Sequence, residues 1–421
     1  MGVRMIQLSP GQKEVLNKTI AWCKKDIPIV ARPNNLGELT NGYTRSKNAC
    51  GGYKSQSESF ITIGGYAGTG KTTLIAALRK RIARLNKKMK VGFVSYTGKA
   101  ARVLRNKLKE AKVILSEDSV GTIHSLIYSP VVNEKEEIVG WKQKEKIDRD
   151  LIIIDEASMV DETIWLHLLS YKVPIIVVGD HGQLPPISGS FHLIAEPELE
   201  LVEIHRQAQD NPIIALSIQA RQTGYVRPGI YGNYIRKFSK EDGDSQELIG
   251  ELLANYSSDT LILCGYNKTR KKLNLHIRST LGFDSPLPQI GDRVICLRNN
   301  HEKHIFNGMT GTILTIKDET KDWYMAKIQM DGEDGIYKGL ISKDQFMSDS
   351  ALNFTNKRAA IMAGDLFDFG YALTVHKAQG SQAKRVILFE ERFPKMNDEQ
   401  WRRWLYTGIT RAEEELYIIP Q

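Results

Sequence analysis

The feature that most constrains the fold is a glycine-rich segment between an apolar strand and a helical pattern. Residues 65–72 read GYAGTGKT, which satisfies the G-x-x-x-x-G-K-[ST] pattern of a phosphate-binding loop. FITIG precedes it at 60–64, and a helix is expected over 71–85. Because such a loop works where a strand delivers it to the start of a helix, the chain is predicted to contain a parallel α/β domain.

Each residue type in this loop suits a phosphate ligand. Glycines let backbone N–H groups approach phosphate oxygens, Lys71 can reach the β- and γ-phosphates, and Thr72 can ligate Mg²⁺. The alternative is a glycine-rich turn that binds nothing. The residues predicted to bind nucleotide here are Gly65, Ala67, Gly68, Thr69, Gly70, Lys71, Thr72 and Thr73.

Short apolar runs alternate with helical patterns over most of the chain, which is typical of parallel sheets covered on both faces. We predict an α/β protein with one lobe at 1–205 and a second at 206–310 and 349–421. Residues 311–348 alternate apolar and polar side chains between turn signals and predict a small antiparallel β insert. Residues 31–58 lack periodicity and are predicted to be an irregular loop.

Composition excludes several classes of protein. The 421 residues are 41% hydrophobic and 25% charged, which excludes a disordered or collagenous chain. The four cysteines have no metal-knuckle spacing, and no apolar run is long enough for a membrane span. A cytoplasmic protein without a membrane partner is therefore expected. The net charge of +9 is compatible with a polyanionic partner.

Two carboxylates end the apolar run at 151–154. Asp155 and Glu156 lie about 80 residues after the loop, and they are predicted to bind Mg²⁺ and to orient an attacking water, respectively. The alternative is a solvated loop start.

Seven further strings occur in the order seen in superfamily-one helicases, and the chain resembles their RecD-like and Dda-like branch in layout. The strings are VSYTGKAA (94–101, motif Ia), GTIHSL (121–126, motif Ib), IDEASMV (154–160, motif II), VVGDHGQLPP (177–186, motif III), GDRVICLRNN with FNGMTG (291–311), YALTVHKAQGSQ (371–382, motif V) and LYTGITRAEEELYI (405–418, motif VI).

The resemblance implies two RecA-like lobes that hold ATP and Mg²⁺ between them. Lys71, Thr72, Asp155 and Glu156 would act from the first lobe, and Gln183 would sense the γ-phosphate. Arg411 would enter from the second lobe as an arginine finger; the alternative is a surface ion pair with Glu413–Glu415. Arg206 would also face the γ-phosphate. The set of catalytic residues implied is Lys71, Asp155, Glu156, Gln183, Arg206 and Arg411.

Residues 8–12 resemble the Q motif of this family, in which Gln12 would recognise the adenine edge. The alternative is an exposed polar residue.

The resemblance also implies a track that binds single-stranded DNA without sequence preference, because hydroxyl and amide donors suit phosphates and aromatic rings stack on bases. His124 and His376 could instead be structural histidines. The residues implied are Thr97, Lys99, Thr122, His124, Trp141, Thr374, His376 and Gln379.

Two inserts resemble accessories of this branch. Residues 128–145 follow motif Ib, where these helicases carry a β-hairpin pin that splits the duplex, and Trp141 could stack on a terminal base pair. The alternative is a surface hairpin whose tryptophan covers its own base. The insert at 311–348 resembles an SH3-like domain.

Together these features predict a monomeric DNA helicase that moves 5′ to 3′ on single-stranded DNA and separates forks, in the host cytoplasm if a phage encodes it. A single-strand-binding, replication or recombination protein is a candidate partner. Two alternatives stay open: a translocase that remodels protein–DNA complexes without unwinding, and a nucleotide-gated binding module with slow hydrolysis.

Overall fold

The computed structural model describes 7–26, 60–132, 138–186, 191–204, 210–241, 245–300, 303, 305–331, 335–349, 352 and 363–420. They form two compact units. The first comprises the described residues within 1–96, 100–129 and 142–210, and the second those within 97–99, 130–141 and 211–421. The predicted loop at 31–58 lies outside the described residues. Within the described residues, no helix is both long and apolar enough to span a bilayer.

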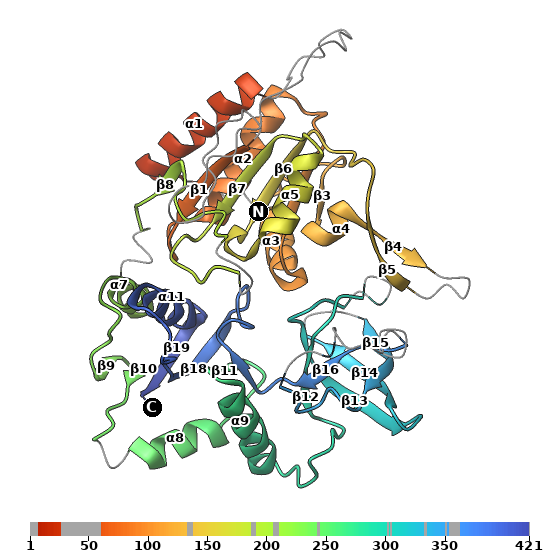
Figure 1. The fold of residues 1–421 in the computed structure, drawn as a ribbon. Coiled ribbons are helices and arrows are strands. Elements are labelled where there is room, and N and C mark those ends of the chain that lie inside the picture. Colours follow the sequence, from red (N-terminus) through yellow and green to blue (C-terminus); the bar gives the residue numbers. More distant parts are fainter. Residues whose placement is uncertain are drawn as a thin grey trace. The chain divides into compact units, whose positions relative to one another are not determined.

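The first unit is built on a six-stranded sheet with the order β3-β2-β6-β7-β1-β8 (Figure 1). Every neighbouring pair of strands runs parallel, as the apolar runs predicted. Its elements are α1 (Pro10–Asp26), β1 (Phe60–Gly65), α2 (Lys71–Leu85), β2 (Val91–Ser95), α3 (Gly98–Glu110), β3 (Ser119–Thr122), α4 (Ile123–Ile127), β6 (Leu151–Asp155), a 3₁₀ turn (Ala157–Met159), α5 (Glu162–Ser170), β7 (Ile175–Gly179) and β8 (Leu199–Leu201).

Both faces of this sheet are buried, which explains why its strands are almost wholly apolar. Ile153 packs with side chains of α1, α2 and α3 in one cluster. Its neighbours Ile152 and Ile154 point to the opposite face and pack with α4 and α5 in a second cluster. Successive strand residues alternate between faces, so each strand must be apolar at every position.

The second unit contains another six-stranded sheet, ordered β17-β11-β18-β19-β10-β9. Its neighbouring strands are parallel except for the edge pair β9 and β10. The α/β class and the parallel-sheet core predicted for the chain are thus confirmed. The elements are α7 (Pro212–Thr223), β9 (Gly229–Gly232), β10 (Ile235–Lys237), α8 (Ser245–Ala254), β11 (Thr260–Cys264), α9 (Asn267–Thr280), β17 (Ala372–Thr374), β18 (Ala383–Glu390), α11 (Asp398–Ile409) and β19 (Ala412–Pro420).

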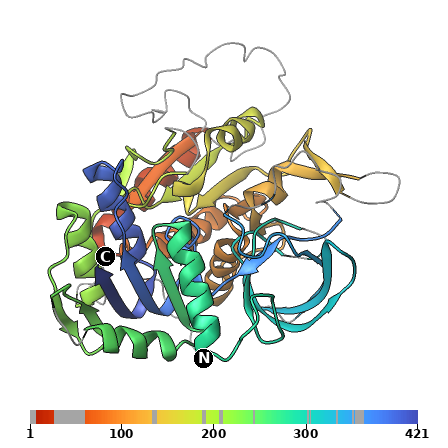
Figure 2. The ribbon, with the colours of Figure 1, turned by 60° about the horizontal axis from the view of Figure 1, so that its bottom comes forward.

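An antiparallel sheet of five strands also belongs to the second unit, with the order β15-β14-β13-β12-β16. Its strands curve strongly around their own core (Figure 2). The sheet extends beyond the insert predicted over 311–348, because β12 and β16 pair with each other across more than 70 residues of sequence. The strands are β12 (Arg293–Cys296), β13 (Thr310–Asp318), β14 (Trp323–Met330), β15 (Ile336–Ser342) and β16 (Phe367–Phe369).

A two-stranded hairpin, β4 (Tyr128–Val132) and β5 (Ile138–Gln143), follows α4. Residues 133–137 between its strands lie outside the described residues. The root of the hairpin is fixed to the first unit, because the Tyr171 hydroxyl lies 2.9 Å from the Ile127 carbonyl oxygen and 2.8 Å from that of Lys144. Gln143 Nε2 also donates to Ser170 Oγ at 2.8 Å.

Candidate active site

The glycine-rich loop joins β1 to α2, as the sequence predicted, and its backbone requires glycine at two positions. Gly68 has φ 79° and Gly70 has φ 76°, values that side chains other than glycine rarely tolerate. Helix α2 begins directly after Gly70. Its first backbone N–H groups have no partner within the helix, so this end suits an anion. Thr72 and Thr73 lie in that first turn.

Lys71 folds back over the loop. Its Nζ donates to the carbonyl oxygens of Gly65 at 2.8 Å and Tyr66 at 3.1 Å. The same Nζ lies 3.6 Å from a carboxylate oxygen of Asp180. The ammonium group is therefore held at the loop that the sequence predicts to cradle phosphates.

Asp155 and Glu156 lie where β6 ends. Asp155 is buried, and its Oδ1 accepts a hydrogen bond from the Glu156 backbone N–H at 3.0 Å. Glu156 has φ 54°, a left-handed conformation that is costly for a non-glycine residue. Its Oε2 is buried and has no hydrogen-bond partner among the described residues. An unsatisfied buried carboxylate oxygen is what a bound water or cation would satisfy.

Electrostatics at this pair favour a cation. Burial, together with the neighbouring carboxylate of Glu156, raises the pKa of Asp155 to about 7, and Lys71 opposes the rise. A raised pKa means that the ionised form is destabilised in the folded protein. A hard divalent cation with oxygen ligands would relieve this cost, so the residues present fit the Mg²⁺ that the motif implies.

The structure brings a further carboxylate to this site. Asp180 follows β7 and is fully buried. Its Oδ1 accepts from the Gly182 N–H at 3.0 Å, and its Oδ2 lies 3.4 Å from Gln183 Nε2. Asp180 thus links Lys71 to Gln183. Asp180 was not among the residues predicted from sequence, although its place after a buried strand was a usable signal.

Gln12 is buried in the first turn of α1 rather than exposed. Its Nε2 donates to the carbonyl oxygens of Thr69 at 3.0 Å and Gly70 at 3.5 Å, and its Oε1 accepts from the Ser9 N–H at 3.0 Å. The alternative of an exposed polar residue is therefore wrong. Gln12 holds α1 against the phosphate-binding loop, and adenine recognition by this residue stays a prediction.

Arg411 belongs to the second unit and is 3% exposed. Its guanidinium donates to the carbonyl oxygens of Thr407 at 3.0 Å and Ser381 at 3.2 Å, and to Thr410 Oγ1 at 3.1 Å. All three acceptors are neutral, so the alternative of a surface ion pair with Glu413–Glu415 is wrong. Arg206, the other predicted arginine, lies outside the described residues.

The predicted nucleic-acid residues fall into two groups. Thr122 and Thr374 are buried and serve local structure: the Thr122 hydroxyl caps α4, and Thr374 Oγ1 accepts from the Lys377 N–H at 3.4 Å. The other group is partly or largely buried, and burial lowers the pKa values of Lys99, His124 and His376. Its members are Thr97, Lys99, His124, His376 and Gln379.

Both histidines are therefore biased toward the neutral form. The His124 ring also packs against Tyr128, with 5.1 Å between ring centroids. Trp141 differs from these residues because it is 38% exposed on β5. Trp141 therefore presents an exposed aromatic surface on the hairpin, whereas the other predicted nucleic-acid residues are buried or partly buried.

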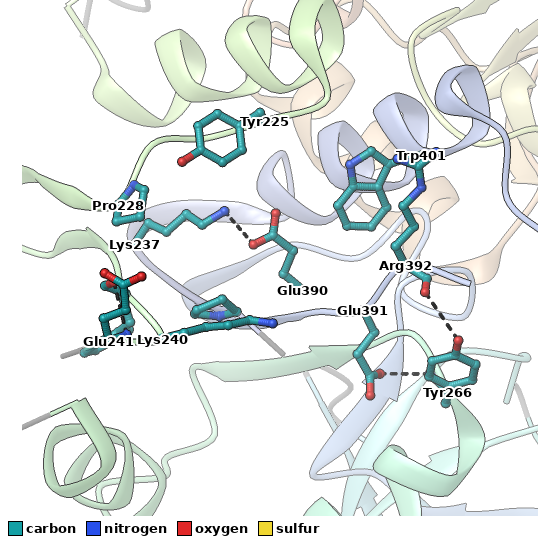
Figure 3. A pocket seen from close by; sticks show the side chains of 13 residues that line it. Tyr225, Pro228, Lys237, Lys240, Glu241, Tyr266, Glu390, Glu391, Arg392 and Trp401 are labelled. Carbon is teal, nitrogen blue, oxygen red and sulfur yellow. Dashed lines mark hydrogen bonds and ion pairs between the residues drawn. The ribbon is translucent and has the colours of Figure 1, made fainter. Parts of the chain in front are cut away.

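A second strand-to-helix junction lies in the second unit, beside a cavity of about 750 Å³ (Figure 3). Gly265 and Tyr266 follow β11, and the same pair of residue types, Gly65 and Tyr66, stands where β1 ends. Here the Glu391 carboxylate accepts from the N–H groups of Gly265 at 2.7 Å and Tyr266 at 3.0 Å. The Glu391 carboxylate thus occupies the backbone N–H groups that a phosphate would need at this junction. The loop of the first unit is therefore the better phosphate site.

The Glu391 contacts predict a measurable loss of stability. Thr269 Oγ1 also donates to Glu391, at 2.5 Å. Hydrogen bonds to a charged acceptor contribute about 1.5–3 kcal/mol each, and their losses at one site are not additive, so Glu391→Ala is expected to lower the free energy of unfolding by about 2–4 kcal/mol. Urea unfolding measures this. Glu241→Ala, an exposed residue lining the same cavity, should leave the midpoint unchanged; equal effects of the two variants would refute the assignment.

Known proteins resemble this chain over most of its length. An AAA domain matches residues 49–189 and a UvrD-like helicase C-terminal domain matches residues 369–419. The ATP-dependent RecD2 DNA helicase of Deinococcus radiodurans is 26% identical over 85% of this chain and 46% of its own length. The chain thus spans about half of that relative. The ATP-dependent DNA helicase dda of Enterobacteria phage T4 is 25% identical over 91% of this chain and 99% of its own.

Among solved structures, a Pif1 helicase described as unwinding forked double-stranded DNA has a TM-score of 0.53 and 17% identity. The likeness covers 98% of this chain and 92% of that protein. At this identity it supports the shared fold, namely the α/β units already described.

Proposed function

We propose that this chain, which is similar to RecD-like and Dda-like DNA helicases, hydrolyses ATP to move 5′ to 3′ along single-stranded DNA and to unwind duplex DNA. The observation that carries the proposal is the site in the first unit. There, Lys71 at a phosphate-binding loop contacts Asp180, which in turn contacts Gln183. The positive charge of Lys71 also acts on Asp155 of the Asp155–Glu156 pair, so these residues form one cluster.

Each residue of this cluster receives a role from its surroundings. Lys71 would exchange its two carbonyl partners for phosphate oxygens, and Thr72 and Asp155 would hold Mg²⁺, which neutralises phosphate charge when bound. Glu156, whose Oε2 lacks a partner among the described residues, would orient the attacking water. Asp180 would position Lys71 and Gln183. Arg411 would supply the positive charge that the transition state requires, together with Arg206.

DNA-stimulated ATP hydrolysis tests the proposal. The wild-type protein is expected to hydrolyse ATP faster when single-stranded DNA is added, and Lys71→Ala should reduce turnover by about 100-fold or more. Lys87→Ala is the matched control, because Lys87 is an exposed lysine just after α2. The proposal would be contradicted if single-stranded DNA did not change the wild-type rate of ATP hydrolysis, or if Lys71→Ala hydrolysed ATP as fast as the control variant.

The rival function, a translocase without productive unwinding, makes a different prediction for the hairpin. Deleting 129–145 should leave protein displacement intact in such a translocase. A helicase that depends on the hairpin should lose strand separation and keep DNA-stimulated hydrolysis. The fixed root of the hairpin and the exposed Trp141 favour the helicase.

Removing a single hydroxyl group tests whether the hairpin must be held rigidly at its root. Tyr171→Phe removes the hydroxyl that bridges Ile127 and Lys144 and keeps the ring. The single hydroxyl hydrogen is shared between the two carbonyl oxygens. Its loss costs about 1 kcal/mol, so unwinding should slow about fivefold while DNA-stimulated hydrolysis is retained. Tyr231→Phe, which also removes a hydroxyl bonded to a carbonyl, should change neither rate. Unwinding at the wild-type rate by Tyr171→Phe would show that the bridge is dispensable.

Proton release is expected to accompany Mg²⁺ and nucleotide binding. The pKa of Asp155 is raised to about 7, so the carboxyl group holds a proton below that pH. Mg²⁺ binds the ionised carboxylate, so the proton must leave when the cation binds. Mg²⁺-dependent affinity for a fluorescent ATP analogue should therefore fall up to about tenfold for each pH unit below about 7. Asp155→Asn should flatten this profile. A wild-type affinity that stays constant from about pH 6 to 8 would exclude Asp155 as the titrating ligand.

A further inference from the structure

A cleft outside the nucleotide site runs along β3, the edge strand of the first sheet. Its volume is about 250 Å³. One wall consists of β3 and the start of α4, and the other consists of residues 144–149, the segment that returns from the hairpin. The cleft leads from Thr122, at the carboxyl end of β3, toward Ser119 at the opposite end.

Three cations line this cleft: Lys144, Lys146 and Arg149. Lys144 Nζ donates to the Ser125 carbonyl oxygen at 2.8 Å, and Arg149 Nε donates to Ser119 Oγ at 2.8 Å. Among the described residues, none of the three forms an ion pair with a carboxylate. Burial, and the positive charge of Arg149, lower the pKa of Lys144, which shows that the two cations are close enough to repel.

One carboxylate, that of Asp148, lines the cleft together with the three cations, and its side chain is 79% exposed. Its carboxylate pairs with Lys90 Nζ at 2.8 Å. The cleft therefore keeps a net positive charge. The Ser119 hydroxyl accepts from Arg149 and retains its own hydrogen, so it can still donate to an oxygen in the cleft.

We propose that this cleft binds backbone phosphates of the DNA arm that diverges at the hairpin. Within the described part of the chain, the three cations form no ion pair with a carboxylate, and a hydroxyl donor lies beside them. Such a group of side chains recognises phosphodiesters irrespective of base sequence. The cleft begins at Thr122, one of the predicted single-strand contacts, and follows β3 away from it, and its second wall is the segment that returns from the hairpin. An arm passing the hairpin root would therefore meet Lys144 and Lys146. The inference rests on the proposed helicase function.

The salt dependence of DNA binding tests the assignment. For duplex DNA, log K falls with log salt by about 0.9 for each phosphate neutralised. Lys144→Met combined with Lys146→Met is therefore expected to reduce the slope for a forked DNA by about 1.8. The slope for an unpaired oligonucleotide should not change. The matched control is Lys87→Met with Lys88→Met, which removes the same charge from an exposed turn of the first unit, and it should alter neither slope.

Two results would overturn the assignment. A fork slope equal to that of the wild type would show that the cleft touches no phosphate. An equal reduction on fork and oligonucleotide would assign the cations to the single-strand track instead. DNA-stimulated hydrolysis by the double variant verifies that it is folded. Failure of the helicase proposal itself would appear separately, as a wild-type protein that binds the fork but does not separate its strands when ATP is added.

Discussion

Replacing Arg411 by lysine is expected to lower kcat for DNA-stimulated ATP hydrolysis by about 10³-fold or more, which is the range measured for removal of an arginine finger. Arg411 is buried, and its three hydrogen-bond acceptors are neutral oxygens. No carboxylate is among these acceptors, so the positive charge of Arg411 is available to an anionic transition state. Lysine keeps a cation but loses the planar fork that can contact two oxygens.

Steady-state hydrolysis at saturating ATP and DNA measures this effect, with circular dichroism to show that the variant is folded. The matched control is Arg392→Ala, in the same unit, because the ion pair of Arg392 with Asp398 is exposed and contributes little. Affinity for ATP should change much less than turnover. A kcat for Arg411→Lys within tenfold of the wild type would exclude the arginine-finger role.

Glu156→Gln is expected to have the second largest effect, a loss of about 10²–10⁴ in kcat with nucleotide binding retained. Glutamine keeps the shape and removes the negative charge with which Glu156 would orient and activate water. The buried Oε2 has no partner among the described residues, so in glutamate it is able to accept a hydrogen bond from the attacking water. The neighbouring Asp155 should also become easier to ionise, because the Glu156 charge raises its pKa.

Single-turnover hydrolysis after rapid mixing separates the chemical step from nucleotide binding for this variant. Glu117→Gln, at an exposed position of the same unit, is the control for removal of one charge and should hydrolyse at the wild-type rate. If Glu156→Gln hydrolysed ATP as fast as that control, another group would have to activate the water.

The parts of the fold that were predictable depend on local pattern. Helix α2 begins and ends where the motif and the helical spacing predicted, at Lys71 and Leu85. The buried strands were visible because both faces of each sheet are covered, which requires apolar residues at successive positions. The antiparallel sheet was recognised only in part. Its strand β16 pairs with β12, which is distant in sequence, and no local pattern encodes such a pairing.

The candidate site shows the same division. Motif spacing predicted Lys71, Asp155 and Glu156 as site residues, because strand ends and helix starts are local features. The role of Asp180 depends on its distance to Lys71, and that of Gln12 depends on carbonyl groups almost 60 residues away. The Glu391 contacts at the second junction span more than 120 residues. Long-range contacts of this kind follow from tertiary packing. Sequence spacing does not reveal the partners, even where, as for Asp180, the place after a buried strand marks the residue as a candidate.

The central claim is that the chain couples ATP hydrolysis to directional strand separation. The most direct measurement is ATP-dependent unwinding of matched DNA duplexes that carry either a 5′ or a 3′ single-stranded tail, with Lys71→Ala as the inactive control. We predict separation of the 5′-tailed duplex alone, and none by Lys71→Ala. Preference for the 3′ tail would contradict the proposed direction, and separation of neither duplex by a protein with DNA-stimulated hydrolysis would contradict the helicase function.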